Sequence, residues 1–201
     1  MIILPSTYLG SVEYFAALAQ HGGECVIDTC EHYIKRTERN RARIMTANGV
    51  MPLSVHIRNA DRPRTPMRDI RIDYSKRWQH LHSVALRSAY GSSPYFEHYA
   101  PEIEPFYEKR YEFLLDYNTE LTALLLRLGH VGGELKLSDA YVEAAPDDTD
   151  MRVKKRESAF VYPEYFQLFS DRLPFAPNLS FIDLLFSEGP SSIDVLRRCR
   201  L

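Results

Sequence analysis

The sequence of 201 residues lacks several features that mark whole classes of protein. No apolar run approaches the roughly 18 residues that span a bilayer. The apolar start ends at Pro5 with no basic residue before it, so we expect neither membrane insertion nor a signal peptide. The net charge of -2 argues against nucleic-acid binding, for which a basic chain is usual. GxGxxG, GxxxxGKS/T and GxSxG are missing, which excludes the usual dinucleotide cradle, the P-loop and the serine-hydrolase elbow.

Cysteine is scarce. Three thiols, Cys25, Cys30 and Cys199, cannot all pair with one another, and the missing signal peptide predicts a cytoplasmic protein with reduced thiols. A structural zinc site needs a second cysteine pair that the chain does not have. His80 and His82 are two residues apart, on different sides of a predicted helix, so they are not placed to share a metal. We therefore expect no metal and no cofactor.

One segment is strongly basic. Between Lys35 and Arg43, five cations stand against the single acid Glu38. Such a concentration of like charge repels itself, so it predicts a compensating partner. Guanidinium groups match the geometry of phosphates and carboxylates, which favours an anionic small-molecule substrate. The predicted anion-binding residues are Lys35, Arg36, Arg39, Asn40 and Arg41. The alternative is a solvated face neutralised by the neighbouring acids Asp28, Glu31 and Glu38.

Residues 1–28 predict a βαβ unit. Residues 1–4 and 24–28 have the profile of short buried strands, and residues 12–20 carry apolar side chains at helical spacing. Ser11 is a suitable N-cap, and Gly22-Gly23 is expected to close the helix with a left-handed residue. The two strands should be parallel neighbours, because a crossover helix joins them.

The loops after two parallel neighbours meet at the carboxyl edge of the sheet, where ligands of α/β folds bind. Residues 5–8 and 28–31 should therefore lie side by side, next to the basic segment. His32 stands between Asp28 and the cations. A carboxylate partner raises its basicity, and the cations keep it neutral, and both effects suit a general base. We predict His32 or Asp28 as the proton acceptor; the alternative for His32 is a structural role.

Beyond residue 40 the sequence predicts a hairpin followed by helices. Asn48-Gly49 is a hairpin signal between extended segments at 42–45 and 53–57, and residues 70–72 and 135–137 are further short strands. Residues 139–150 form an acidic loop that is either mobile or folded over the basic segment. Helices are predicted over residues 75–90, with Leu81 in the apolar stripe, and over 101–128, 162–169, 181–186 and from 191 or 192 onward.

The predicted fold is therefore α/β. We expect a single domain with a small, mostly parallel mixed sheet and a helical C-terminal half. Residues 1–74 make the α/β part and residues 75–201 the mainly helical part.

Separated blocks of sequence resemble the WbqC-like protein family of bacterial surface-polysaccharide gene clusters. The matching stretches are residues 5–8 with 14–15, residues 31–33 with Lys35, Thr37 and 39–41, Trp78 with His82, and residues 88–96, 105–108, 178–186 and 188–190. The resemblance covers essentially the whole chain. Two positions depart from it: Glu38 stands where many relatives carry an aromatic residue, and residues 79–82 replace a more usual His-Trp arrangement.

The resemblance implies a role in O-antigen or related polysaccharide precursor assembly, such as acyl or aminoacyl transfer to a nucleotide-linked amino sugar. Direct attack by a substrate amine needs only positioning and a base, which agrees with the missing nucleophile motif. The aromatic residues predicted to line the pocket, or alternatively to fill the core, are Tyr8, Tyr33, Trp78, His82 and Tyr90. The competing hypothesis is a non-catalytic binding or scaffold protein of the same pathway, whose basic segment docks an acidic partner.

Overall fold

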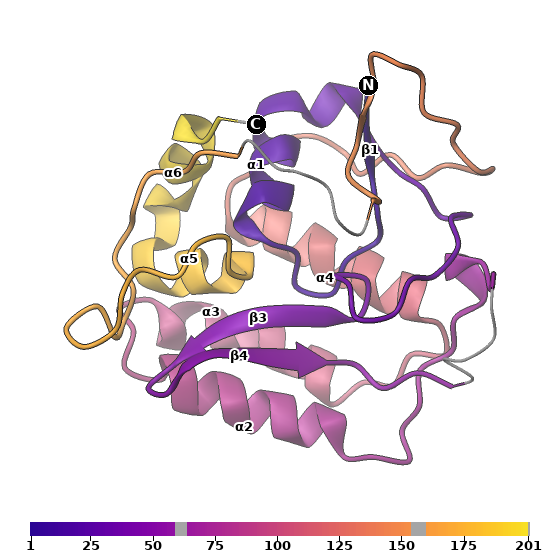
Figure 1. The fold of residues 1–201 in the computed structure, drawn as a ribbon. Helices are drawn as coiled ribbons and strands as arrows, with labels where there is room; N and C mark the ends of the chain where they lie inside the picture. Colours follow the sequence, from indigo (N-terminus) through magenta and orange to yellow (C-terminus); the bar gives the residue numbers. More distant parts are fainter. Residues whose placement is uncertain (59–63, 154–159, 201) are drawn as a thin grey trace.

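Strand β1 (Ile2–Leu4) is the central strand of a three-stranded sheet in the computed structural model, which describes residues 1–58, 64–153 and 160–200. Strand β2 (Cys25–Ile27) and strand β5 (Thr149–Asp150) both pair with β1 in parallel. Helix α1 (Val12–His21) joins β1 to β2, so the predicted βαβ unit is confirmed (Figure 1). The mixed α/β class of a single domain is confirmed with it.

Helix α1 begins as predicted and ends differently. The Ser11 side chain accepts a hydrogen bond from the backbone N–H of Tyr14 at 3.4 Å, the geometry of an N-cap. The left-handed residue expected at Gly22-Gly23 is wrong, because Gly22 has φ -50 and the helix runs into a 3-10 turn, η1 (Gly22–Glu24). This tight turn delivers the chain directly into β2, so no reversal through a left-handed residue is needed.

The basic segment leads into an antiparallel hairpin, as predicted. Strands β3 (Arg41–Thr46) and β4 (Gly49–Ser54) pair so that Thr46 lies opposite Gly49, which has φ +100. A left-handed residue costs glycine little, which explains why the turn forms at Asn48-Gly49. Strand β4 ends at Ser54, before the predicted residue 57. In Figure 1 the hairpin lies across helix α2 (Trp78–Tyr90), which contacts β3.

The long helix predicted over residues 101–128 is wrong, because the chain forms two helices there. Helix α3 (Phe96–Ile103) passes into a 3-10 turn, η3 (Glu104–Tyr107), and helix α4 (Leu114–Leu128) starts only after a break. Pro105 lies at the start of η3, where it has no N–H to offer a continuing α-helix. The break is held by tertiary contacts: Phe113 forms an isolated β-bridge with Arg71.

The remaining helices are C-terminal. Helix α5 (Phe181–Glu188) passes through the 3-10 turn η4 (Gly189–Ser191) into helix α6 (Ser192–Arg198), close to the prediction. The helix predicted over residues 162–169 is wrong: the chain there is irregular, and the Gln167 side chain is hydrogen-bonded to the backbone of Ala176. Leu81, predicted inside, is 61% exposed, because α2 buries the face that carries Trp78 and Leu86.

The strands predicted at residues 70–72 and 135–137 are present only as isolated β-bridges. The segment at 70–72 forms isolated bridges and follows a 3-10 turn, η2 (Met67–Asp69), and Leu137 alone bridges to Ile27. The acidic loop after residue 139 ends in β5, on the edge of the sheet. Asp150 therefore meets Arg152, two residues on, rather than the basic segment.

Candidate functional site

A cavity of about 340 Å³ lies where the basic segment, the start of α1 and residues 151–153 meet. Its walls come from parts of the chain that are far apart in sequence: the loop after β1, strand β3, and the segment before α5. Charged side chains are numerous in its lining. They are Glu13, Arg36, Glu38, Arg39, Arg41, Arg43 and Arg152.

Arg39 is the most deeply buried cation of the basic segment, at 2% exposed. Its Nε donates to Glu31 Oε1 at 2.9 Å, and its Nη2 makes a second bond to Glu31 Oε2, a bidentate ion pair. Arg39 also donates to the backbone carbonyl of Arg152 at 3.1 Å and to Thr37 Oγ1 at 3.2 Å. Burial raises the pKa of Glu31, and Arg39 opposes that rise. The protein itself therefore neutralises Arg39.

Asp28 forms an ion pair with a second buried arginine, Arg152. Its carboxylate is fully buried and pairs with Arg152 Nη1. It also accepts hydrogen bonds from the backbone N–H of Cys30 at 2.9 Å and of Val142 at 3.2 Å. Arg152 donates in addition to both oxygens of Asp150, at 2.9 and 2.8 Å. Asp28 is thus committed to structure and lies behind the cavity rather than in its lining.

Three arginines at the cavity remain without an acidic partner. Within residues 1–58, 64–153 and 160–200, no carboxylate forms an ion pair with Arg36, Arg41 or Arg43. Arg41 and Arg43 alternate with buried residues along β3, so they share one face of the strand. The Nε of Arg41 donates to Ser54 Oγ at 3.0 Å, which orients the guanidinium without neutralising it. The arginines of the basic segment at the cavity are therefore of two kinds: Arg39 is paired, and Arg36, Arg41 and Arg43 have no carboxylate partner among the described residues.

Glu38 brings a carboxylate into the same cavity. Its Oε2 accepts hydrogen bonds from Ser11 Oγ at 3.0 Å and from the Ser11 N–H at 3.4 Å, at the N-terminus of α1. A helix N-terminus favours negative charge, so the carboxylate occupies a position that suits an anion. The residue as a whole is exposed, yet desolvation of its carboxyl by the cavity walls raises its pKa, against the effect of the Ser11 hydrogen bonds.

Backbone strain gathers around this cavity. Leu9, Arg36 and Asn178 line it and have φ of +48, +57 and +49, in the left-handed region that side chains disfavour. Asn178 is held by two bonds to Glu13: its Oδ1 accepts from the backbone N–H at 2.9 Å, and its Nδ2 donates to the carboxylate at 3.2 Å. Left-handed non-glycine residues cost about 1–3 kcal/mol each and often cluster at functional sites. Their shared location favours a functional role for the cavity.

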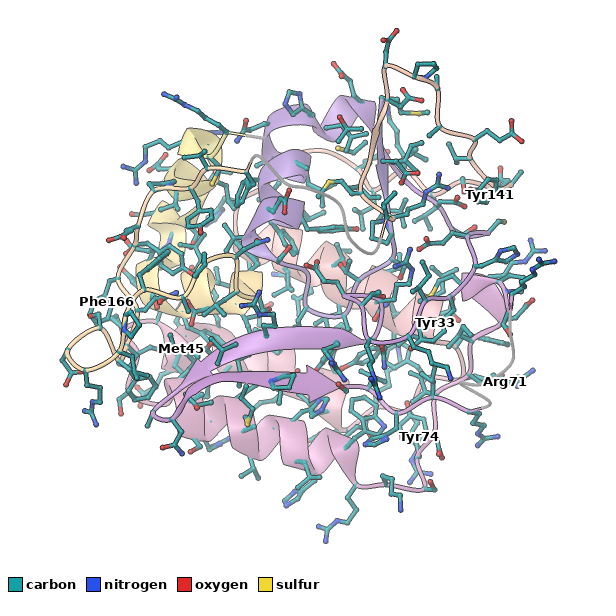
Figure 2. All side chains as sticks on the ribbon, in the orientation of Figure 1. Tyr33, Met45, Arg71, Tyr74, Tyr141 and Phe166 are labelled. Carbon is teal, nitrogen blue, oxygen red and sulfur yellow. The ribbon has the colours of Figure 1, made fainter. Side chains whose placement is uncertain are left out.

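The structure brings only part of the predicted site together. Arg36, Arg39 and Arg41 line the cavity, whereas Lys35 and Asn40 do not. The Asn40 side chain donates to the Val55 carbonyl at 2.9 Å, a contact that fixes the start of the hairpin. His32, predicted as a base, is exposed and forms a β-bridge with Pro66 outside the cavity lining. Tyr33 is half-buried, at the end of the hairpin remote from Met45 (Figure 2).

The other predicted aromatic residues lie in the core. Tyr8 and Tyr90 are fully buried, Trp78 is 1% exposed and His82 is 5% exposed. The Tyr8 hydroxyl is 2.8 Å from His82 Nδ1, and burial lowers the pKa of His82 to about 4. The Tyr90 hydroxyl donates to Asp183 at 2.8 Å. These residues form hydrogen-bonded aromatic packing and are absent from the cavity lining.

Sequence reasoning gave no site role to several residues that the structure places at the cavity. Among them are Ser11, Glu13, Glu38, Arg43, Arg152 and Asn178. Glu13 and Asn178 meet across 165 residues of sequence, so no local pattern links them. A signal for Asn178 was available, because it begins one of the blocks that carry the family resemblance.

No group of three or more histidine, cysteine, aspartate or glutamate side chains among the described residues could hold a metal ion. Within the same part of the chain, none of the helices combines the length and apolar character that crossing a membrane requires.

Comparison with known proteins relates the chain to one protein family and to a mycobacterial protein. The model of the WbqC-like protein family matches residues 6–162. The uncharacterized protein Rv1507c of Mycobacterium tuberculosis is 28% identical over 236 aligned residues, which cover 98% of this chain and 97% of that protein. No solved structure gives a significant match.

Proposed function

The chain belongs to the WbqC-like protein family, and we propose that its cavity binds a phosphate-bearing amino sugar to which the protein transfers an acyl or aminoacyl group. The observation that carries the proposal is the set of three unpaired arginines, Arg36, Arg41 and Arg43, around one cavity. Guanidinium groups bind phosphate oxygens in fork geometry, and a phosphate monoester carries about 1.5 to 2 negative charges at pH 7. A bound phosphate would therefore offset most of the charge that the protein leaves uncompensated.

The size of the cavity limits what it can enclose. About 340 Å³ is at the lower end of the roughly 300–1,000 Å³ of small-molecule sites. That volume suits one phosphorylated sugar, and the remainder of a nucleotide carrier would extend beyond the cavity.

The proposed reaction is direct attack of the substrate amine on an activated acyl donor. The serine hydroxyls of the lining are engaged elsewhere: Ser11 Oγ donates to Glu38, and Ser180 Oγ donates to the Leu9 carbonyl at 2.7 Å. A mechanism without a protein nucleophile needs substrate positioning and a proton acceptor, which together can supply most of the rate enhancement. The family setting in polysaccharide gene clusters supports an amino sugar as acceptor.

A thermal-shift titration of the full chain with glucosamine 1-phosphate tests the proposal. At 100 times Kd the ligand adds about 2.7 kcal/mol to stability, which raises the Tm of a domain of this size by roughly 5–11 °C. The double variant Arg41→Ala/Arg43→Ala should abolish the shift. Arg197→Ala, which removes an exposed arginine on α6 outside the cavity, should keep it.

Turnover is tested separately by mass spectrometry of the sugar phosphate after incubation with acyl-coenzyme A or aminoacyl donors. No shift with any phosphorylated sugar, or the same shift in the Arg41→Ala/Arg43→Ala variant, would refute the proposal. Binding without acylation by any donor would favour the non-catalytic hypothesis.

A further inference from the structure

The cavity contains a carboxylate oxygen, Oε1 of Glu38, that accepts no hydrogen bond from the described residues. Two acids line the cavity, Glu13 and Glu38. Glu13 is 7% exposed and tied to Asn178 through both its N–H and its carboxylate. Glu38 uses Oε2 for Ser11, and no donor among the described residues reaches its Oε1. Glu38 is therefore the acid of the cavity with capacity for a ligand.

The other acids and the predicted histidine base do not compete for this role. Both oxygens of Glu31 are taken by Arg39. Asp28 accepts four hydrogen bonds, including that of Arg152, and does not line the cavity. His32 is exposed outside it.

The start of α1 is already saturated, so it does not attract a ligand anion. The N–H groups of Val12, Glu13 and Tyr14 donate to the Leu179 carbonyl, to Asn178 and to Ser11 Oγ, and the N–H of Ser11 donates to Glu38. Glu38 contributes a carboxylate to the lining beside α1, whereas Arg41 and Arg43 contribute guanidinium groups from β3. The lining therefore offers partners to ligand groups of either charge.

We infer that the cavity selects ligands that carry both an amine and an anion, and that Glu38 binds the amine and accepts its proton. This inference rests on the proposed function. The ammonium group gives one proton to Glu38, and the neutral amine nitrogen then forms a bond to the carbonyl carbon of the acyl donor. The bond from that carbon to the leaving thiol or alcohol breaks, the leaving group keeps the electron pair, and it takes the second proton lost by nitrogen.

The surroundings of Glu38 adjust its basicity in both directions. Desolvation raises its pKa, which improves a carboxylate as a base, while Ser11, Arg43 and Arg39 lower it. The other charged or titratable groups of the lining are Glu13, Tyr14, Arg36, Arg41 and Arg152. Because the base must be ionised, transfer should fall on the acidic side of the pH profile as Glu38 becomes protonated.

Calorimetric titration of three matched sugar phosphates tests the inference. Glucosamine 1-phosphate carries the amine, glucose 1-phosphate lacks it, and N-acetylglucosamine 1-phosphate carries it as a neutral amide. The wild type should bind the first more tightly than the other two by on the order of 10- to 100-fold, the range of a hydrogen bond between charged groups. Glu38→Gln should remove that preference and should not weaken glucose 1-phosphate binding, because the change removes a negative charge and keeps the arginines. Glu164→Gln, at an exposed acid outside the cavity, should keep the preference.

The outcomes separate this inference from the proposed function. If none of the three sugar phosphates binds the wild type, the proposed function itself is wrong. If all bind equally well, or Glu38→Gln keeps the amine preference, the sugar-phosphate site stands and the role of Glu38 is refuted. The comparison of the three ligands on the wild type decides the case even if the variant does not fold. With an active donor, Glu38→Gln should also flatten the acidic limb of the kcat profile.

Discussion

Replacing Arg39 should mainly lower the free energy of unfolding, and any loss of ligand binding should be a secondary effect. The Arg39 and Glu31 side chains are 2% and 3% exposed, so Arg39→Ala leaves a buried carboxylate without its counter-charge. Breaking a buried ion pair from one side costs about 3–5 kcal/mol. For a domain of this size the Tm should fall by roughly 6–20 °C.

Urea titration followed by fluorescence measures this loss directly. The single tryptophan, Trp78, is 1% exposed and reports on the unfolding of the core. Glu31→Leu alone should be similarly destabilising. The double variant Arg39→Met/Glu31→Leu should recover much of the stability, because apolar residues of similar volume replace both charges. Arg41→Ala and Arg43→Ala should change stability by no more than about 0.5 kcal/mol.

A loss below about 1 kcal/mol for Arg39→Ala and for Arg39→Met, with no coupling between Arg39→Met and Glu31→Leu, would contradict this reasoning. It would mean that the pair does not form in solution and that Arg39 is available to a ligand, as the sequence alone predicted. The double-mutant cycle isolates the pairwise contribution, because the two residues are in direct contact.

Three further predictions concern the core and the turns. Burial lowers the pKa of His82 from 6.5 to about 4, so at intermediate pH this group binds a proton in the unfolded chain and not in the folded one. His82 alone should therefore lower the unfolding free energy by roughly 3 kcal/mol from pH 6.5 to 4, whereas Glu31 and Asp183, whose pKa burial raises, contribute with the opposite sign. The difference in pH dependence between the wild type and His82→Gln in urea titrations measures the His82 contribution. Asp183→Ala removes the acceptor for two buried tyrosine hydroxyls and a glutamine amide, so it should lower the unfolding free energy by about 3–6 kcal/mol, measured by calorimetry. Asp183→Asn keeps one acceptor oxygen and should lose less; an equal loss would contradict this account. Gly189→Ala should lower the unfolding free energy by about 2–5 kcal/mol, because φ is +56 and the new Cβ lies 2.6 Å from a tyrosine ring. Gly133→Ala, with φ +103 and no neighbouring atoms, should lower it by about 1 kcal/mol. Gly132→Ala, with neither feature, should leave it unchanged.

Much of the N-terminal fold could be predicted because its signals are local. The β1–α1–β2 unit and the hairpin turn are encoded in short consecutive stretches, in which strand patterns, the Ser11 cap and Gly49 each specify their own conformation. The helix over residues 101–128 could not be divided correctly from sequence. Its apolar spacing continues through the break, and only tertiary contacts such as the Phe113 bridge show where α4 starts.

The basic segment that the sequence singled out lines the cavity in part, but the pairing of its charges could not be predicted. The sequence identified the basic segment and left open whether acids or a bound anion compensate it. Glu31 compensates Arg39, while among the described residues no carboxylate pairs with Arg36 or Arg41. The contribution of Arg152 has no local signal, because it meets Asp28 from a distance of 124 residues along the chain.

The central position of β1 has a consequence for how the protein is made. Ile2 pairs with Cys25 on one side and with Thr149 on the other. During synthesis β1 can pair with β2 early, but it can pair with β5 only after residues 149–150 have left the ribosome. Contacts between such distant residues slow folding, and strand edges that stay unpaired promote association between chains. We therefore expect chains truncated before residue 149 to be prone to aggregation.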